Sequence, residues 1–175
     1  SNTLFELIDN EILNVKKGLK GKIILKLNSF TSYKFVDKLY QASQSGVKIK
    51  LLIRGICCLI PNKIGLSENI EVKSVVDKYL EHSRVYVFEN GGETKVYISS
   101  ADIMTRNIEK RVEVACPIYQ EDLKKQILDT LYISDNDNVK TRLINHNSQN
   151  KFETNSKKII RSQLDTYSYF KKNLD

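Results

Sequence analysis

The sequence predicts an α/β fold, in which helices flank a mixed sheet and a basic helix forms the C-terminal tail. In the first third of the chain, amphipathic segments alternate with short apolar runs, which is the pattern of a βαβ unit with a parallel strand pair. Farther on, Asn90-Gly91 separates two alternating segments, and this indicates an antiparallel hairpin. Together these observations predict a sheet with both parallel and antiparallel pairs.

The N-terminal third is predicted to contain two helices and two strands. Leu4, Ile8 and Ile12 share one face of a helix that begins near Thr3 and ends before Gly18. A strand, a second helix and a second strand are then expected over residues 22–28, 29–44 and 47–53. This alternation predicts that the two strands are parallel neighbours.

The middle of the chain is predicted to form a loop, a third strand and the hairpin. Arg54 leaves the second strand and opens the loop, which runs to about residue 69. Residues 70–75 are expected to form a strand and residues 76–81 a short helical turn. The elements that follow are expected at 84–88 and 95–99 (hairpin strands), 112–116 (a strand with Pro117 behind it) and 122–131 (a helix).

The C-terminal part is predicted to consist of loops followed by one helix. Residues 134–155 are polar and Asn-rich, so loops are expected there. Residues 156–175 carry apolar residues at helical spacing with Lys and Arg between them, and Ser156 can cap the helix. We therefore expect a catalytic domain over residues 3–133 and a basic helix that packs on the same domain.

The composition excludes several classes of protein. With 41% hydrophobic and 28% charged residues, the composition is typical of a globular protein rather than a disordered one. No apolar run approaches the length that a membrane span needs. Three cysteines, two of them adjacent (Cys57 and Cys58), do not form a disulfide framework, and zinc-ligand spacing is absent. A reducing cytoplasmic location is expected. Ser1-Asn2 resembles the scar that tag removal leaves, so the chain is expected to be an excised piece.

The net charge of +7 favours polyanionic partners such as nucleic acid, anionic lipid or chains of phosphate. A generally solvated basic surface explains the same charge. Charge alone therefore leaves the class of partner open.

The residues around the hairpin form the strongest candidate site. Residues two apart on a strand face the same side, so His82 and Arg84 can point into one site. Closure of the hairpin brings Ser99, Ser100 and Asp102 beside them. Imidazole supplies a nucleophile or an acid near neutral pH, while a guanidinium and hydroxyls hold phosphate oxygens. The pattern predicts a phosphate site.

Further charged residues are candidates for supporting roles in this site. Arg54 stands at the end of an apolar strand, where ligands of α/β sheets bind. Arg106 and Arg111 follow Asp102 and are either phosphate contacts or solvated charges. Glu89 lies seven residues after His82 and, like Asp102, can hold an arginine in place.

This layout resembles the phospholipase D superfamily motif, which has His-x-Lys, then an acidic residue, then Gly-Ser-x-Asn after a hairpin. Residues 82–84 stand for the first part, Glu89 for the acid and residues 99–102 for the last part. Arg replaces Lys, Ser replaces Gly and Asp replaces Asn, which weighs against a nuclease or a lipase. The resemblance implies a phospholipase D-like mixed sheet.

The sequence more closely resembles the bacterial polyphosphate kinase family. Four blocks follow the family's order and spacing, at residues 51–61, 76–88, 97–102 and 104–107. The resemblance implies the second C-terminal phospholipase D-like domain of an enzyme that reversibly transfers the terminal phosphate of ATP to polyphosphate with Mg²⁺. It also implies that His82 and Arg54 contact nucleotide phosphate, with Arg84 beside them.

The resemblance further implies what lies outside this chain. The histidine that becomes phosphorylated and the Mg²⁺ ligands are expected in the preceding domains of the same polypeptide, so this piece alone is expected to be inactive. A homo-oligomer is expected for the full-length enzyme, in the cytoplasm or peripherally at the inner membrane face, with no nucleic-acid partner.

Two alternatives remain open at the level of sequence. One is a phospholipase D-like phosphodiesterase half-site that pairs two copies of His82 in a dimer. The other is a basic module that binds polyanions or nucleic acid, which does not explain why His82, Arg84 and two serines meet across one hairpin.

Overall fold

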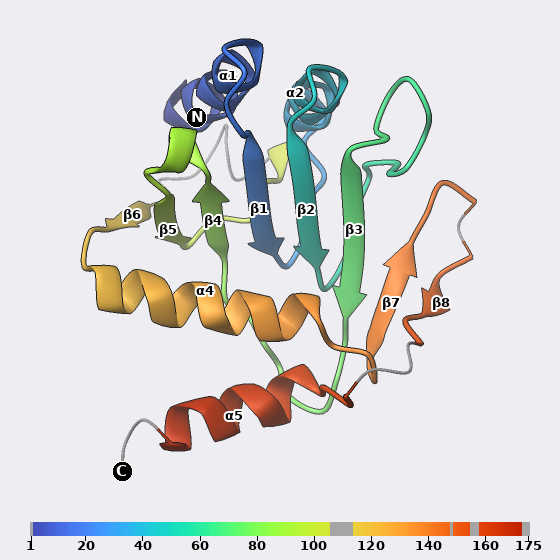
Figure 1. Cartoon of the computed structure of the whole chain (residues 1–175). Helices are drawn as coiled ribbons and strands as arrows, with labels where there is room; N and C mark the ends of the chain where they lie inside the picture. The colour runs from blue at the N-terminus through green and yellow to red at the C-terminus, as the bar shows by residue number, and fades with distance from the viewer. Residues whose placement is uncertain (1, 106–113, 148, 155–157, 173–175) are drawn as a thin grey trace.

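The computed structural model describes residues 2–105, 114–147, 149–154 and 158–172. Within these residues the strands form one sheet in the order β6-β5-β4-β1-β2-β3-β7-β8 (Figure 1). The strands are β1 (Lys22–Leu27), β2 (Lys48–Ile53), β3 (Ile70–Val75), β4 (Val85–Phe88), β5 (Lys95–Ser99), β6 (Ala115–Ile118), β7 (Thr141–Ile144) and β8 (Lys151–Phe152). The helices are α1 (Asn2–Lys16), α2 (Tyr33–Gln44), α4 (Glu121–Asp135) and α5 (Ser162–Lys172), with a short 3₁₀ turn at Asn90–Gly92.

The sheet is mixed, as predicted. Strand β2 pairs in parallel with both β1 and β3, and the register places Leu27 beside Ile53. Strands β4, β5 and β6 extend the sheet from β1 by antiparallel pairing, while β7 and β8 extend it from β3 in the same way. The carboxyl ends of β1 and β2 therefore lie together at one edge.

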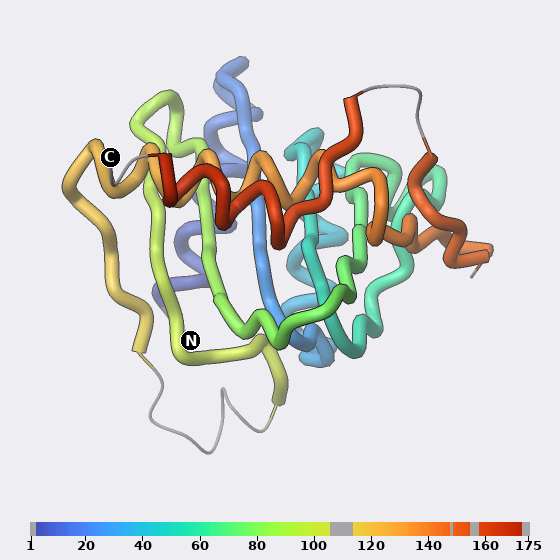
Figure 2. Tube along the Cα trace, turned by 90° about the horizontal axis from the view of Figure 1, so that it is seen from below, coloured from blue at the N-terminus to red at the C-terminus, as the bar shows by residue number. Residues whose placement is uncertain are grey.

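Two apolar layers cover the two faces of the sheet. On one face, α1 and α2 pack through residues such as Ile8 and Leu39 against Leu25 and Leu51, which are all nearly or fully buried. On the other face, Leu131 of α4 packs against Leu52, Val87 and their neighbours. Helix α5 lies outside α4, and the view from below shows the two running side by side (Figure 2). Alternation along each strand produces both layers, because successive side chains point to opposite faces.

Helix α1 holds the hairpin turn through one buried carboxylate. Glu11, which is fully buried, accepts hydrogen bonds from the backbone N–H groups of Lys22 and Asn90, at 3.0 and 2.6 Å. Burial raises the pKa of Glu11, although both backbone N–H groups oppose the shift. Asn90, Gly91 and Gly92 all have positive φ, so the turn needs an Asn-Gly-Gly type of sequence.

Several predicted elements differ from the structure. Residues 76–81 form no helical turn, and residues 134–155 are not only loops because β7 and β8 lie there. The expected 112–116 strand is found as β6, which begins at Ala115 and includes Pro117; residues 112 and 113 lie outside the described part of the chain. An edge strand tolerates proline because its outer N–H groups need no partner.

The helices also differ at their ends. Helix α4 continues past the predicted residue 131 to Asp135, and α2 begins at Tyr33 rather than at residue 29. Helix α5 begins at Ser162, after Lys158–Arg161 in non-helical backbone, and Ser156 lies outside the described residues. Among the described residues, no helix is both long and apolar enough to cross a bilayer.

Candidate phosphate site

The site starts where two parallel strands end side by side. Asn28 follows β1 and Arg54 follows β2, so the register of the pair brings these two residues together. The Nε and Nη2 groups of Arg54 donate to Asn28 Oδ1 at 3.0 and 2.5 Å. This contact fixes the plane of the half-buried guanidinium, and it leaves Nη1 without a hydrogen-bond partner among the described residues.

The hairpin brings the second half of the site to the same edge. Ser99 N–H donates to the carbonyl of Arg84 at 3.0 Å, so the end of β5 lies beside the start of β4. Three residues later, Asp102 meets the Arg84 side chain, with Arg84 Nη2 donating to Oδ2 at 3.1 Å and Nε 3.0 Å from Oδ1. The predicted closure of the hairpin thus places Asp102 against Arg84.

Asp102 joins the hairpin to the end of β1. Its Oδ1 accepts the backbone N–H groups of Asn28 and Ser29 at 2.8 and 3.0 Å, and the residue is 4% exposed. The pKa of Asp102 is lowered: burial alone would raise it, but the hydrogen bonds from Arg84 and from the two backbone groups outweigh burial. The carboxylate is therefore a fixed negative charge that orients Arg84.

His82 is attached to this group through Arg84. The Arg84 Nη2 lies 2.7 Å from His82 Nε2. A guanidinium only donates, so Nε2 is the acceptor, and the imidazole in this contact is neutral with its proton on Nδ1. The exposed ring thus has its Nδ1–H available as a donor.

The two serines support the hairpin rather than standing free. Ser99 Oγ donates to the carbonyl of Val114 and accepts the N–H of Ala101, at 3.2 and 3.0 Å. Ser100 Oγ accepts the N–H of Val114 at 3.1 Å. Both hydroxyls therefore hold Val114, which leads into β6, beside the residues just before Asp102.

The remaining candidates lie elsewhere. Glu89 follows β4 at the opposite edge of the sheet, where its N–H donates to the carbonyl of Lys22, so the structure does not bring it to His82. Arg106 and Arg111 lie outside the described residues. Cys57 packs against the apolar core, and burial raises the pKa of its thiol to about 11.

Three residues of the site escaped the sequence analysis. Asn28 links Arg54 to the Asp102 loop, and parallel pairing of residues 22–28 with 47–53 was the signal that could have revealed it. Lys26 and Glu81 form an ion pair of 2.7 Å next to His82. No local pattern links two residues so far apart in sequence.

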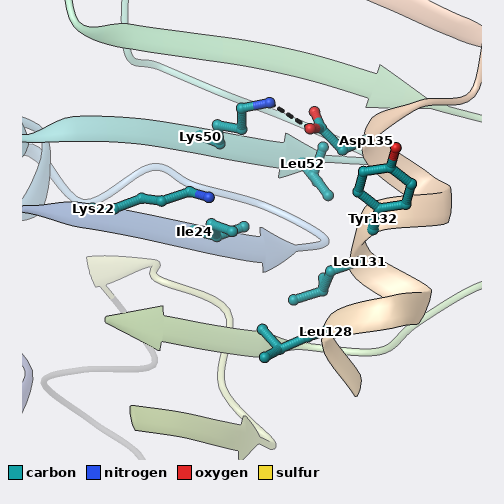
Figure 3. Close-up of a pocket in the computed structure, with 8 residues that line it drawn as sticks. All are labelled: Lys22, Ile24, Lys50, Leu52, Leu128, Leu131, Tyr132 and Asp135. Carbon is teal, nitrogen blue, oxygen red and sulfur yellow. Dashed lines mark hydrogen bonds and ion pairs between the residues drawn. The ribbon is translucent and has the colours of Figure 1, made fainter. Parts of the chain in front are cut away.

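Two of the pockets among the described residues are lined by β1, β2 and the α4 side of the sheet. A small one is lined by Lys26, Arg54 and Glu81 and so adjoins the candidate site. The other has a volume of about 190 Å³ and lies between β1, β2 and α4, where Lys50 pairs with Asp135 over an apolar floor (Figure 3). None of the candidate site residues lines this second pocket.

No group of three His, Cys, Asp or Glu side chains that could hold a metal ion is found within the described residues. Asp102 faces Arg84 and two N–H groups instead, so the described carboxylate at the site does not fit a Mg²⁺ ligand set.

Comparison with known proteins shows which family the chain resembles. A family model described as polyphosphate kinase C-terminal domain 2 matches residues 1–163. Over 169 residues, or 96% of its length, the chain is 50% identical to polyphosphate kinase of Escherichia coli K12 and 46% identical to that of Vibrio parahaemolyticus. It covers 25% and 24% of those proteins, about a quarter of their length.

Solved structures agree on the fold. The crystal structure of polyphosphate kinase from Porphyromonas gingivalis superposes with a TM-score of 0.96 at 43% identity, over 98% of this chain and 26% of that one. A phospholipase D family member, Nuc from Salmonella typhimurium, superposes with a TM-score of 0.54 at 19% identity, over 77% and 88% of the two chains, which shows a shared fold alone. The chain therefore belongs to the polyphosphate kinase C-terminal domain 2 family and has a phospholipase D-like α/β fold.

Proposed function

We propose that this domain holds the phosphates of ATP or ADP and supplies His82 for reversible transfer of the terminal phosphate of ATP to polyphosphate. The observation that carries the proposal is one continuous set of contacts, from Arg54 through Asn28, Asp102 and Arg84 to His82, at the carboxyl edge of the sheet. Two guanidinium groups and an imidazole donor suit a phosphate group.

Arg54 is proposed to bind nucleotide phosphate. Asn28 takes Nε and Nη2, which orients the guanidinium plane and leaves Nη1 for a phosphate oxygen. A preoriented cation neutralises the negative charge that spreads over the phosphoryl oxygens in the transition state. Arg54 would thus assist phosphoryl transfer through its positive charge and its fixed position.

His82 is proposed to donate a hydrogen bond from Nδ1–H to the transferring group. Arg84 takes the lone pair of Nε2, and Asp102 holds Arg84, so the tautomer that donates from Nδ1 is preorganised. The ring is exposed and therefore accessible to a bound phosphate.

The rest of the reaction is proposed to belong to other parts of a longer polypeptide, called here the parent enzyme. The relatives named polyphosphate kinase are about four times as long as this chain. We assign the phosphorylated histidine to a preceding domain, and we expect Mg²⁺, whose charge would assist transfer, to have its ligands there too. The parent enzyme is proposed to be a homo-oligomer.

Replacement of His82 tests the proposal. In the parent enzyme, His82→Ala should lower kcat for ATP-dependent polyphosphate synthesis by about 10²- to 10³-fold, the usual contribution of one preorganised hydrogen-bond donor. The matched control is His146→Ala, because His146 is the other histidine and is exposed outside the site.

The result is interpretable only when the circular dichroism spectrum and Tm of both variants match the unchanged enzyme. Activity of His82→Ala within twofold of the control would remove His82 from the reaction. Hydrolysis of phosphodiesters by the unchanged enzyme, lost in His82→Ala, would instead support the phospholipase D-like alternative.

A further inference from the structure

The loop that carries His82 has no regular structure of its own. Residues 76–84 connect β3 to β4 without forming a helix or a strand, and most of them are exposed. An exposed nine-residue connection of this kind samples many conformations unless side chains from elsewhere hold it. The position of His82 therefore depends on what the loop contacts.

One ion pair fastens the start of the loop to the C-terminal segment. Arg161 donates from Nε to Asp77 Oδ2 at 2.8 Å and from Nη2 to Oδ1 at 2.7 Å, which is a bidentate contact. The Asp77 side chain is 2% exposed. The hydrogen bond from Arg161 is the main reason why the pKa of Asp77 is lowered.

An amide fastens the loop again two residues later. Gln163 Oε1 accepts the N–H of Tyr79 at 2.9 Å, and Gln163 Nε2 donates to the carbonyl of Tyr79 at 2.8 Å. One side chain thus satisfies both backbone groups of Tyr79, as a neighbouring strand would. Figure 1 shows the green chain after β3 descending to the start of α5 before it turns back to β4.

The segment that holds the loop is itself fixed. Ser162 N–H donates to Asp137 Oδ2 at 2.7 Å, and Ile160 N–H donates to Asn138 Oδ1 at 2.9 Å. Asp137 is fully buried. Arg161 and Gln163 therefore project from backbone that is anchored at the end of α4.

These contacts confine His82 from both sides. Tyr79 is held by Gln163, and Arg84 is held by Asp102, which leaves four residues between the two fixed points. Within this interval, Glu81 is paired with Lys26 at 2.7 Å. Because only four residues separate these two positions, we expect a shift of Tyr79 to move the segment that carries His82.

We propose that Arg161 and Gln163 are positioning residues for phosphoryl transfer, which act by holding the His82 loop at Asp77 and Tyr79. The expected effect on kcat rests on the proposed function of His82, whereas the expected effect on the conformation of the loop does not. Neither residue touches the Arg54, Arg84 or Asp102 side chains.

The test uses Gln163→Ala, Arg161→Gln and the conservative variant Arg161→Lys in the parent enzyme, with Lys171→Gln near the end of α5 as the control. Lys171 is exposed and has no ion pair among the described residues. For each variant, hydrogen exchange of the amides of residues 76–84, the kcat and KM for ATP, and the Tm are measured.

Gln163→Ala and Arg161→Gln should speed amide exchange in the loop and lower kcat by about 10- to 100-fold, because small displacements of reacting groups have effects of this size. The Tm and the exchange rates of β1 and β2 amides should stay close to those of Lys171→Gln. Arg161→Lys should recover only part of kcat, since an ammonium cannot form the bidentate contact.

Unchanged amide exchange in residues 76–84 of Gln163→Ala and Arg161→Gln would overturn the inference. If His82→Ala lowers kcat as proposed, faster exchange in the loop with an unchanged kcat would overturn it as well. If His82→Ala is fully active, the proposed function fails, and the exchange measurement alone then decides whether the two residues hold the loop. If Arg161→Gln does not fold, Gln163→Ala carries the same test.

Discussion

At the scale of single residues, Arg84 and Asp102 decide the geometry of the candidate site. One guanidinium nitrogen, Nη2, contacts both His82 Nε2 and Asp102 Oδ2. Asp102 in turn accepts two backbone N–H groups at the end of β1. The orientation of His82 therefore depends on the Asp102 carboxylate, which acts on the imidazole through Arg84.

Replacing Asp102 by Ala should destabilise the domain by about 3 kcal/mol, because it leaves the Arg84 charge and two backbone donors without their acceptor. Urea denaturation measures the change. The control is Glu93→Gln, since Glu93 is exposed in the hairpin turn. A loss below about 1 kcal/mol for Asp102→Ala would mean that the contact contributes little.

At the scale of elements, Asp137 joins three of them after α4 ends. Its Oδ1 accepts the N–H groups of Val139, Lys140 and Thr141 at 3.0, 2.7 and 3.1 Å, which sets the entry into β7. Its Oδ2 accepts the N–H of Ser162 at the start of α5. One carboxylate thereby determines how α4, β7 and α5 meet.

Asp137→Asn should lower the free energy of unfolding at neutral pH by about 2 kcal/mol. Both carboxylate oxygens of Asp137 accept backbone N–H groups, whereas an Asn amide has one acceptor oxygen and an NH₂ group that would face a backbone N–H. The pKa of Asp137 is lowered by these hydrogen bonds in spite of burial. Its contribution is therefore fully present above the ordinary Asp pKa of about 3.9 and is lost as pH falls through the lower folded pKa.

Urea denaturation between about pH 2 and pH 7 checks this prediction. The unchanged domain should lose stability toward acid more steeply than Asp137→Asn, and the two should converge at low pH. The remaining slope reflects other carboxyls with a lowered pKa, such as Asp102. Parallel curves for the two proteins over the whole range would contradict the assignment.

At the scale of the whole molecule, the domain is proposed to supply Arg54 and His82 as the groups that contact nucleotide phosphate. The family's relatives extend over about four times its length. We expect the purified 175-residue chain to make no polyphosphate from ATP, because the phosphorylated histidine is proposed to lie in another domain. Polyphosphate formed with ATP, Mg²⁺ and a polyphosphate primer is the readout, with the parent enzyme as the positive control.

Robust synthesis by the chain alone would contradict this division of the active site. Binding of ATP, polyphosphate and single-stranded DNA to the chain at matched salt separates a phosphate-specific site from a general preference for polyanions. Equal affinity for all three ligands would favour the basic-module alternative.

The sequence alone determined the parts of the fold that local patterns encode. Periodicity along the chain was sufficient for α1, α2, α4 and the five strands from β1 to β5, because each of these has an apolar face or a glycine-rich turn. The hairpin also predicted that Asp102 lies near Arg84, since a turn at Asn90–Gly92 sets which residues are opposite one another.

Only the tertiary structure decided the rest. Strands β7 and β8 are short, and they form because β3 offers unpaired backbone groups to β7 and β7 offers its own to β8. Asn28 beside Arg54, Lys26 beside Glu81, and Arg161 beside Asp77 join residues 26, 55 and 84 positions apart. Such contacts depend on how distant segments pack. The sequence therefore predicted that Arg84 and Asp102 lie near His82, but it could not predict the contacts of Arg161 and Gln163 with the loop that carries His82.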